Sequence, residues 1–272
     1  MTSIDTIDLA AVKQGQQAVW ASGDYGAIAA MIHVVAERLV DAVNPEAGSS
    51  VLDVAGGTGN AAIAAARSNC RVTGTDYVPA LLERAAERAR AERLDIAFEL
   101  ADAEALPYAD GAYDTVLSVF GAMFTPDQPR AAAELARVCR PGGLIGLAAW
   151  TPQGFLGDWF RATAAHAAPP AGLASPLRWG TEEGVAELLG DTVSSIHTHR
   201  RMFTWRFPDA AALVRIFRTR YGPTLKAFER VGPDGAAALE DDLLAVVQRA
   251  AHRRGSAITI PAEYLEVVAV RR

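Results

Sequence analysis

The sequence predicts an α/β protein with a mainly parallel sheet and helices on both faces. Between residues 51 and 150, short apolar segments of strand character alternate with segments of helical periodicity. Strands that alternate with helices of about 10–15 residues are typical of β-α units, whose parallel strands are joined by right-handed crossovers. A length of 272 residues fits one large domain better than two independent ones. We therefore expect a single doubly wound domain.

The first half of the chain supplies most of these elements. Ile28, Ile32 and Val35 lie at helical spacing and predict a helix over residues 25–43, with Asp24 as its candidate N-cap. Strands and helices are then expected in alternation at 51–55, 60–67, 72–76, 79–92, 96–100, 114–120, 128–138 and 144–150.

After Trp150 the alternation stops. Residues 152–180 are rich in proline, glycine and aromatic residues, and predict an insertion packed over the sheet edge. Beyond it, helices are expected at 181–189, 208–218 and 236–252, and strands at 193–207 and 264–270.

Composition excludes several classes of protein. The formal charge of −6 offers no basic surface for nucleic acid. The longest strongly apolar stretch, Leu144–Trp150, is far shorter than the roughly 20 residues that span a bilayer. The start has no secretory signal, and Cys70 and Cys139 lie far apart without metal or redox spacing. We expect a cytoplasmic protein without a structural metal or a membrane partner.

A glycine-rich turn, in the segment VLDVAGGTGN at residues 51–60, follows the first strand. Glycines let the backbone turn sharply and let a ligand approach without a Cβ in the way. The helix that begins near Asn60 presents unpaired N–H groups and a positive dipole end. Doubly wound sheets bind nucleotide-like ligands at such a turn.

Two ligand classes compete for this turn. The segment 57–62 matches the dinucleotide pattern in its alanine-tolerant form, which keeps an NAD(P)-linked oxidoreductase open. Asp53, however, lies three residues before Gly56, where a carboxylate would repel a pyrophosphate but suits a ligand with an ammonium and a sulfonium. Asp102 and Ala103 follow the third strand, where a short acid can accept a hydrogen bond from an adenine amino group. These placements weigh against NAD.

Four ordered motifs resemble one family. Residues 51–60 (VLDVAGGTGN), 73–78 (TGTDYV), 101–120 (ADAEALPYADGAYDTVLSVF) and 137–150 (RVCRPGGLIGLAAW) are similar to the class I S-adenosylmethionine-dependent methyltransferases. Within that family, the small-molecule group that includes the ubiquinone and menaquinone C-methyltransferases is the most similar. The resemblance covers about residues 46–150.

The resemblance implies S-adenosyl-L-methionine as the cofactor. Asp53 would orient the glycine turn and the cofactor's amino group. The turn passing under the methionyl part comprises Gly56, Gly57, Thr58, Gly59 and Asn60.

The adenosine part of the cofactor is assigned to the next two strands. Asp76 matches the acid that accepts both ribose hydroxyls, which suit a bidentate carboxylate. Tyr77 would flank the adenine, and Asp102 with Ala103 would bind its edge.

The resemblance also implies a lid and a cover. Ser118 and Phe120 would face the methyl group, while Trp20 and Tyr25 belong to an N-terminal helical lid over residues 1–45. Residues 46–150 form the Rossmann-like core, and residues 151–272 supply the substrate cover and the completing strands. The sheet is expected to have seven strands, of which the last runs antiparallel.

The expected reaction is methyl transfer by in-line displacement to a small-molecule metabolite whose identity the sequence leaves open. Phe124, Trp150, Phe155, Trp159 and Tyr221 are candidates to line an apolar substrate pocket, although core packing explains most of them equally well.

No residue qualifies as an obvious general base. His166 and Tyr221 are the best candidates, and neither is expected to be indispensable. A non-methylating, cyclase-like relative that keeps the cofactor fold stays open beside the methyltransferase and the oxidoreductase.

Overall fold

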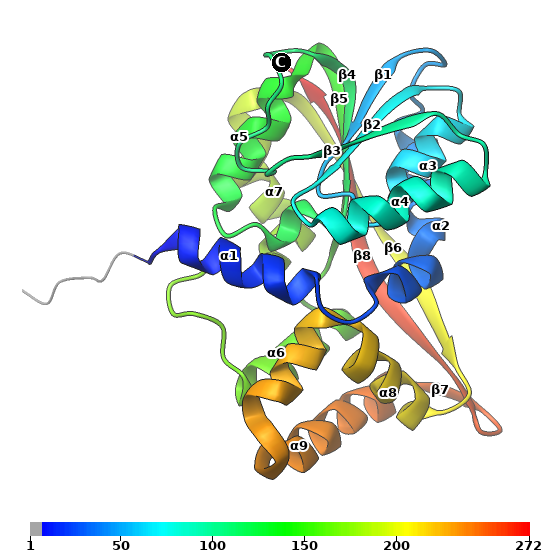
Figure 1. Cartoon of the computed structure of the whole chain (residues 1–272), viewed down its shortest axis with the longest axis vertical. Helices are drawn as coiled ribbons and strands as arrows, with labels where there is room; N and C mark the ends of the chain where they lie inside the picture. The colour runs from blue at the N-terminus through cyan, green and yellow to red at the C-terminus, as the bar shows by residue number, and fades with distance from the viewer. Residues whose placement is uncertain (1–6) are drawn as a thin grey trace, which may run out of the picture.

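The computed structural model describes residues 7–272, whose strands form one mixed sheet (Figure 1). Hydrogen-bonded neighbours follow the order β3-β2-β1-β4-β5-β8-β6, and β7 adds a short eighth strand beside β8. In chain order the strands are β1 (Ser50–Asp53), β2 (Arg71–Asp76), β3 (Ile96–Leu100), β4 (Tyr113–Val119), β5 (Cys139–Trp150), β6 (Val193–Phe207), β7 (His252–Arg254) and β8 (Ala257–Arg271). The predicted fold class is confirmed, with one short strand more than the seven expected.

Strand direction divides the sheet into two parts. Strands β1 to β5 pair in parallel, whereas β8 runs antiparallel to both β5 and β6. The antiparallel last strand is therefore as predicted. It begins at Ala257 rather than at residue 264, because its first half pairs with the far end of β6, where Ile258 lies opposite Phe207.

Helices cover both faces of the parallel part (Figure 1). One face carries α2 (Tyr25–Val43), α3 (Asn60–Arg67) and α4 (Pro79–Ala91), and the other carries α5 (Gln128–Val138) and α7 (Glu182–Leu189). Short 3-10 turns complete the connections at η1 (Ala122–Phe124), η2 (Pro176–Gly180) and η3 (Gly190–Thr192).

The predicted lid divides into two helices with different surroundings. Asp24 caps α2 as expected, since its carboxylate accepts a hydrogen bond from the amide of Ala27. The buried face of α2 packs on the sheet, with Leu39 and Val43 over Gly146. The other helix, α1 (Leu9–Trp20), buries no residue fully and lies over the strand ends, where Tyr25 at the start of α2 joins it. Residues 1–6 of the expected lid lie outside the described residues.

A second group of helices lies beyond the carboxyl ends of the parallel strands, where β6 and β8 extend past the main sheet (Figure 1). This group comprises α6 (Phe155–His166), α8 (Ala210–Arg220) and α9 (Gly222–Ala250). The expected helix over 236–252 is only the second half of α9, which is kinked at Gly232 with φ of 67°. The first half escapes prediction because Pro223 resembles a helix breaker, yet proline is tolerated in the first turn of a helix.

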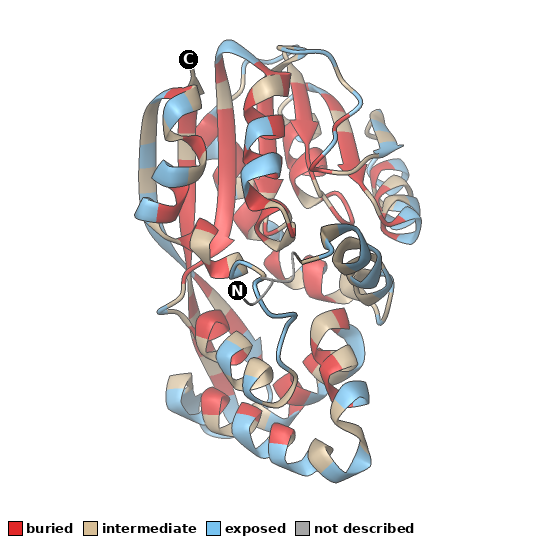
Figure 2. Ribbon diagram, turned by 90° about the vertical axis from the view of Figure 1, so that its left-hand side faces the viewer, coloured by how far each residue is buried: buried red, intermediate tan, exposed pale blue. Residues whose placement is uncertain are grey.

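Burial follows this arrangement. Figure 2 shows the sheet as a nearly continuous buried layer, while the helices expose their outer faces. Within residues 7–272, no helix is both long enough and apolar enough to cross a bilayer.

Candidate active site

A pocket opens at the carboxyl ends of the parallel strands, where β1 lies between β2 and β4. Strand order reverses at this point, and open α/β sheets bind ligands in the resulting crevice. The pocket spans about 610 Å³ of space, part of which is open to solvent. We call it the acidic pocket, because its charged lining residues are Asp76, Asp102, Glu104 and Lys13.

Asp53 lies beneath the glycine turn and is fully buried. Its Oδ2 accepts a hydrogen bond of 2.9 Å from the amide of Ala62, whereas Oδ1 has no partner among the described residues. Burial raises the pKa of Asp53 to about 7; the Ala62 hydrogen bond opposes this shift and the neighbouring Asp76 adds to it. A cation bound nearby would favour the ionised form of this carboxylate.

Asp76 ends β2 and presents its buried carboxylate to the pocket. Oδ2 accepts from the amide of Gly57 and Oδ1 from the amide of Val78, both at 2.9 Å. Burial raises its pKa to about 6 against these hydrogen bonds. Because each carboxylate oxygen can accept two hydrogen bonds, both oxygens keep capacity for a pair of ligand hydroxyls.

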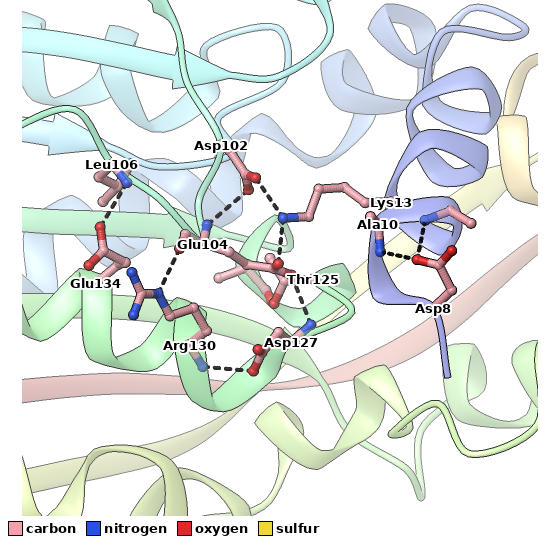
Figure 3. A network of polar contacts seen from close by, with 12 residues as sticks. Asp8, Ala10, Lys13, Asp102, Glu104, Leu106, Thr125, Asp127, Arg130 and Glu134 are labelled. Atoms are coloured by element: carbon pink, nitrogen blue, oxygen red, sulfur yellow. Dashed lines mark hydrogen bonds and ion pairs between the residues drawn. The ribbon is translucent and has the colours of Figure 1, made fainter. Parts of the chain in front are cut away.

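The third acid, Asp102, is paired with the lid helix (Figure 3). Nζ of Lys13 on α1 lies 2.6 Å from Oδ2 of Asp102 and 2.5 Å from Oε2 of Glu104. Burial disfavours the Lys13 ammonium, but the hydrogen bonds and charges of both acids outweigh this effect and raise its pKa. Glu104 is itself held by the amide of Asp127, which donates to Oε1.

Two more contacts hold α1 over the pocket. The side-chain amide of Gln17 donates to the backbone carbonyl of Tyr77. At the end of α1, the Trp20 ring packs edge-on against Phe124, Tyr25 and Tyr221, with centroid distances of 4.9, 5.6 and 5.8 Å. The lid is thus tied by polar contacts to the segments that follow β2 and β3, and by aromatic contacts to Tyr25, Phe124 and Tyr221.

The turns after β1 and β4 carry backbone strain. Ala55 and Phe120 have φ of 51° and 56°, in the left-handed region that side chains rarely adopt. The Phe120 ring stacks on Trp150 with centroids 3.9 Å apart. A Cβ on Gly121 would lie 2.1 Å from the carbonyl oxygen of Ala55, so the two turns touch backbone to backbone. Strain held by such packing is typical of ligand sites.

Eight of the residues predicted to bind the cofactor line the acidic pocket. They are Trp20, Tyr25, Gly57, Asp76, Tyr77, Asp102, Ala103 and Phe120. The other six are not among its lining residues: Asp53, Gly56, Thr58, Gly59, Asn60 and Ser118. Ser118, for example, links the two strained turns, since its hydroxyl donates to the carbonyl of Val54 and accepts from the amide of Ala122.

Two further cavities adjoin the acidic pocket. The smaller one, here the aromatic pocket, has only apolar and aromatic walls: Trp20, Tyr25, Ile28, Ile32, Phe120, Phe124, Trp150, Leu156, Trp205, Phe217 and Tyr221. The larger one, here the large cavity, lies between α1, α6, α9 and the segment 167–177, with about 1550 Å³ of space. Trp20 and Phe124 line all three spaces, which makes this pair the junction between them.

The predicted substrate residues divide among these cavities. Phe124 is at the junction, Trp150 lines the aromatic pocket, and Trp159 lines the large cavity. Tyr221 lines both of the latter two. Phe155 is buried and lines none of the three.

The two candidate bases have different surroundings. His166 Nε2 lies 2.7 Å from Oδ2 of Asp242 on α9, and His166 lines none of the three spaces. Burial, with a smaller contribution from Tyr25, raises the pKa of Tyr221 well above its ordinary value, so its hydroxyl stays protonated.

Sequence reasoning missed several lining residues. Lys13, Gln16 and Glu104 line the acidic pocket; Lys13 and Gln16 lie outside the four motifs, and Glu104 lies within the third motif but was given no role. A compositional signal existed for Lys13: the chain has only two lysines, and the other, Lys226, lines the large cavity.

Sequence comparisons find a matching domain family and related proteins. The model of the family described as "Methyltransferase domain" matches residues 51–143. The uncharacterized protein Rv1405c of Mycobacterium tuberculosis is 40% identical over 234 residues, which cover 83% of this chain and 84% of that protein. A demethylmenaquinone methyltransferase of Deinococcus radiodurans is 39% identical over 126 residues, which cover 45% of this chain and 52% of that enzyme.

Solved structures share the fold. The YcgJ protein of Bacillus subtilis superposes with a TM-score of 0.61 at 16% identity, over 88% of this chain and 99% of that one. The [4+2]-cyclase SpnF superposes with a TM-score of 0.53 at 19% identity, over 88% of this chain and 80% of that one. The geranyl diphosphate C-methyltransferase of Streptomyces coelicolor, solved with S-adenosyl-L-homocysteine, gives 0.53 at 17% identity, over 88% and 79%.

The family match lies on the strands and turns that build the acidic pocket. The orphaned Asp53 oxygen and the pocket-facing carboxylate of Asp76 fit a cationic adenosine ligand better than a pyrophosphate. The chain therefore belongs to the class I S-adenosylmethionine-dependent methyltransferase family.

Proposed function

We propose that this protein transfers a methyl group from S-adenosylmethionine to a small molecule held in the large cavity, with the reacting atoms meeting at Trp20 and Phe124. The cofactor, when bound, supplies an electrophilic methyl group on a sulfonium. The observation that carries the proposal is that the acidic pocket and the large cavity adjoin, because Trp20 and Phe124 line both.

The acidic pocket suits the cofactor's charge and hydroxyls. Asp76 offers two oxygens to the ribose hydroxyls, and Asp53 places a negative charge beneath the glycine turn. Asp102 is the acceptor available to an adenine amino group, and Lys13 can keep its contact with Glu104 when Asp102 takes that role. The three acids together stabilise a cationic ligand.

The aromatic junction excludes water and orients the acceptor. Trp20 and Phe124 pack edge to face, and the aromatic pocket behind them has no charged wall residue. A methyl transfer of this type needs the acceptor close and in line, and such positioning can contribute roughly 7–11 kcal/mol. Water kept out of the junction cannot compete as the acceptor.

We infer that transfer proceeds without a dedicated base. None of the described residues that line the aromatic pocket or the large cavity is His, Asp or Glu. The ionisable side chains of the aromatic pocket are Tyr25 and Tyr221. Burial raises the pKa of both hydroxyls, so both stay protonated. Proximity and orientation are then the chain's main contribution.

The cyclase-like alternative keeps a specific motivation, since the neighbour SpnF is a cyclase. An NAD(P)-linked oxidoreductase has no such support, and the acids around the pocket oppose a pyrophosphate.

Calorimetry and product release together test the proposal. Purified protein should give saturable heat with S-adenosylmethionine and S-adenosylhomocysteine but none with NADH, and should release S-adenosylhomocysteine with at least one member of a panel of small-molecule acceptors. Heat with NADH alone contradicts the proposal. Cofactor binding without release over the whole panel favours the cyclase-like alternative.

A further inference from the structure

The large cavity has a charge opposite to that of the acidic pocket. Its charged lining residues are Arg161, Lys226 and Arg230, and no acid of the described chain lines it. The acidic pocket instead carries three acids and one lysine. This contrast occurs in a chain with a net charge of −6, so the basic lining does not follow from overall composition.

Arg230 is the basic residue best placed to meet an anion. Arg161 is engaged by Asp158, and Lys226 lies 2.7 Å from Glu229. Within residues 7–272, no carboxylate lies within ion-pair distance of Arg230, whose one hydrogen bond goes to the carbonyl of Ala168 at 2.7 Å. That contact uses Nη1, so other guanidinium N–H groups remain for a ligand.

The α9 helix sets the direction of the cavity. Tyr221, which packs against Trp20, caps the start of α9, and Arg230 lies on the same helix. At 1.5 Å of rise per residue, the two positions are about 13 Å apart along the axis. Lys226 and Arg230, four residues apart, share one face of this helix.

Apolar side chains line much of the same cavity. Trp159 and Phe160 come from α6, Leu173 and Leu177 from the segment that follows it, and Ala227 from α9. Such walls favour an apolar ligand body, and burial of that body supplies most of its binding free energy.

We propose that the large cavity binds an amphipathic carboxylate whose charged end lies at Arg230 and whose apolar end faces the junction of Trp20 and Phe124. One part of this proposal rests on the proposed function, namely that the bound carboxylate is the methyl acceptor. It also predicts that the end presented to the cofactor pocket is the apolar one, with the carboxylate held at Arg230.

Intrinsic fluorescence gives a direct test, because Trp20 and Trp159 line the cavity. The probes are dodecanoate, 1-dodecanol and dodecylamine, titrated into the full chain without cofactor, the two ionic probes below their micelle concentrations and dodecanol below its solubility limit. Dodecanoate should bind about 5- to 10-fold more tightly than dodecanol, and dodecylamine should bind most weakly.

Arg230→Gln should remove that preference by weakening dodecanoate about 5- to 10-fold, and dodecanol should be unaffected. The matched control is Arg249→Gln, which makes the same charge change at an exposed position of the same helix outside the cavity. It should leave both probes unchanged. Thermal melting and calorimetry with S-adenosylhomocysteine verify that the Arg230 variant is folded.

Equal affinity for dodecanoate and dodecanol in the wild type overturns the inference, as does the absence of saturable binding by any probe. An equal loss in the Arg249 variant overturns it too. Because the titration uses no cofactor, these results are independent of the calorimetry that tests the proposed function.

Discussion

The acidic pocket and the large cavity share a wall but differ in how they are built. The pocket is formed by turns at strand ends, with carboxylates held by backbone amides at Asp53 and Asp76. The cavity is formed by helices, with basic side chains at its border and apolar ones inside. Backbone amides fix charges in place, whereas long arginine side chains on helices can adapt to different ligands. The difference suggests a fixed cofactor site beside a cavity whose selectivity depends on few residues.

The largest expected effect comes from removal of a fixed charge. Asp76→Ala should weaken S-adenosylhomocysteine binding by about 2–4 kcal/mol, because two charge-assisted hydrogen bonds to the ribose are lost. Calorimetry measures it, with the exposed Asp95→Ala as the control. If the variant binds as tightly as the wild type, Asp76 does not hold the ribose hydroxyls.

A second effect is the pH dependence of the ligand-free protein. The pKa of Asp53 is about 7 and that of Asp76 about 6, both above the ordinary 3.8. The native state therefore holds protons that the unfolded chain has released, so the free energy of unfolding falls as the pH rises from about 4 to 7.

Asp53→Asn should remove its share of this fall, on the order of 2–3 kcal/mol between pH 5 and pH 8. Denaturant unfolding at both pH values checks this, with Asp95→Asn as the control. If the free energy of unfolding changes with pH in the Asp53 variant as it does in the wild type, the pKa of Asp53 is not raised in the ligand-free protein.

A smaller effect concerns the lid. Lys13→Ala removes both ion pairs to Asp102 and Glu104, and should cost about 1 kcal/mol of stability. Hydrogen exchange over residues 9–20 should become faster, whereas the surface variant Arg84→Ala should leave this segment unchanged. Cofactor should slow exchange over residues 15–30 in the wild type. If exchange in α1 does not respond to Lys13→Ala, the lid is held by its aromatic contacts instead.

The smallest expected effect concerns Arg161, the second arginine of the large cavity. Arg161→Gln should weaken dodecanoate only about twofold, because Arg161 is exposed and already paired with Asp158. A loss as large as that of Arg230→Gln would show that the carboxylate is shared between the two helices.

The sequence predicted the parallel core well because each strand end carries a local signal. The glycine turn after β1 and the acids Asp76 and Asp102 are short-range features, and the structure gathers them at one edge of the sheet. The alternating pattern of residues 193–207 likewise matches the bounds of β6.

The lid and the helical cavity were harder to predict because their contacts are distant in sequence. Lys13 meets Asp102 across 89 residues, and no local periodicity encodes that pairing. Residues 25–43 have the pattern of an amphipathic helix, which does not distinguish a lid from a core helix. Arg230 precedes the Gly232 kink in the half of α9 that begins with Pro223, and no local motif marks the cavity that it borders.

Two adjoining sites of opposite charge should bind their ligands at the same time. Titration of dodecanoate into protein saturated with S-adenosylhomocysteine measures this. One dodecanoate should bind per chain, with an affinity close to that of the cofactor-free protein. Displacement of S-adenosylhomocysteine by dodecanoate, or loss of dodecanoate binding on saturation, would contradict it.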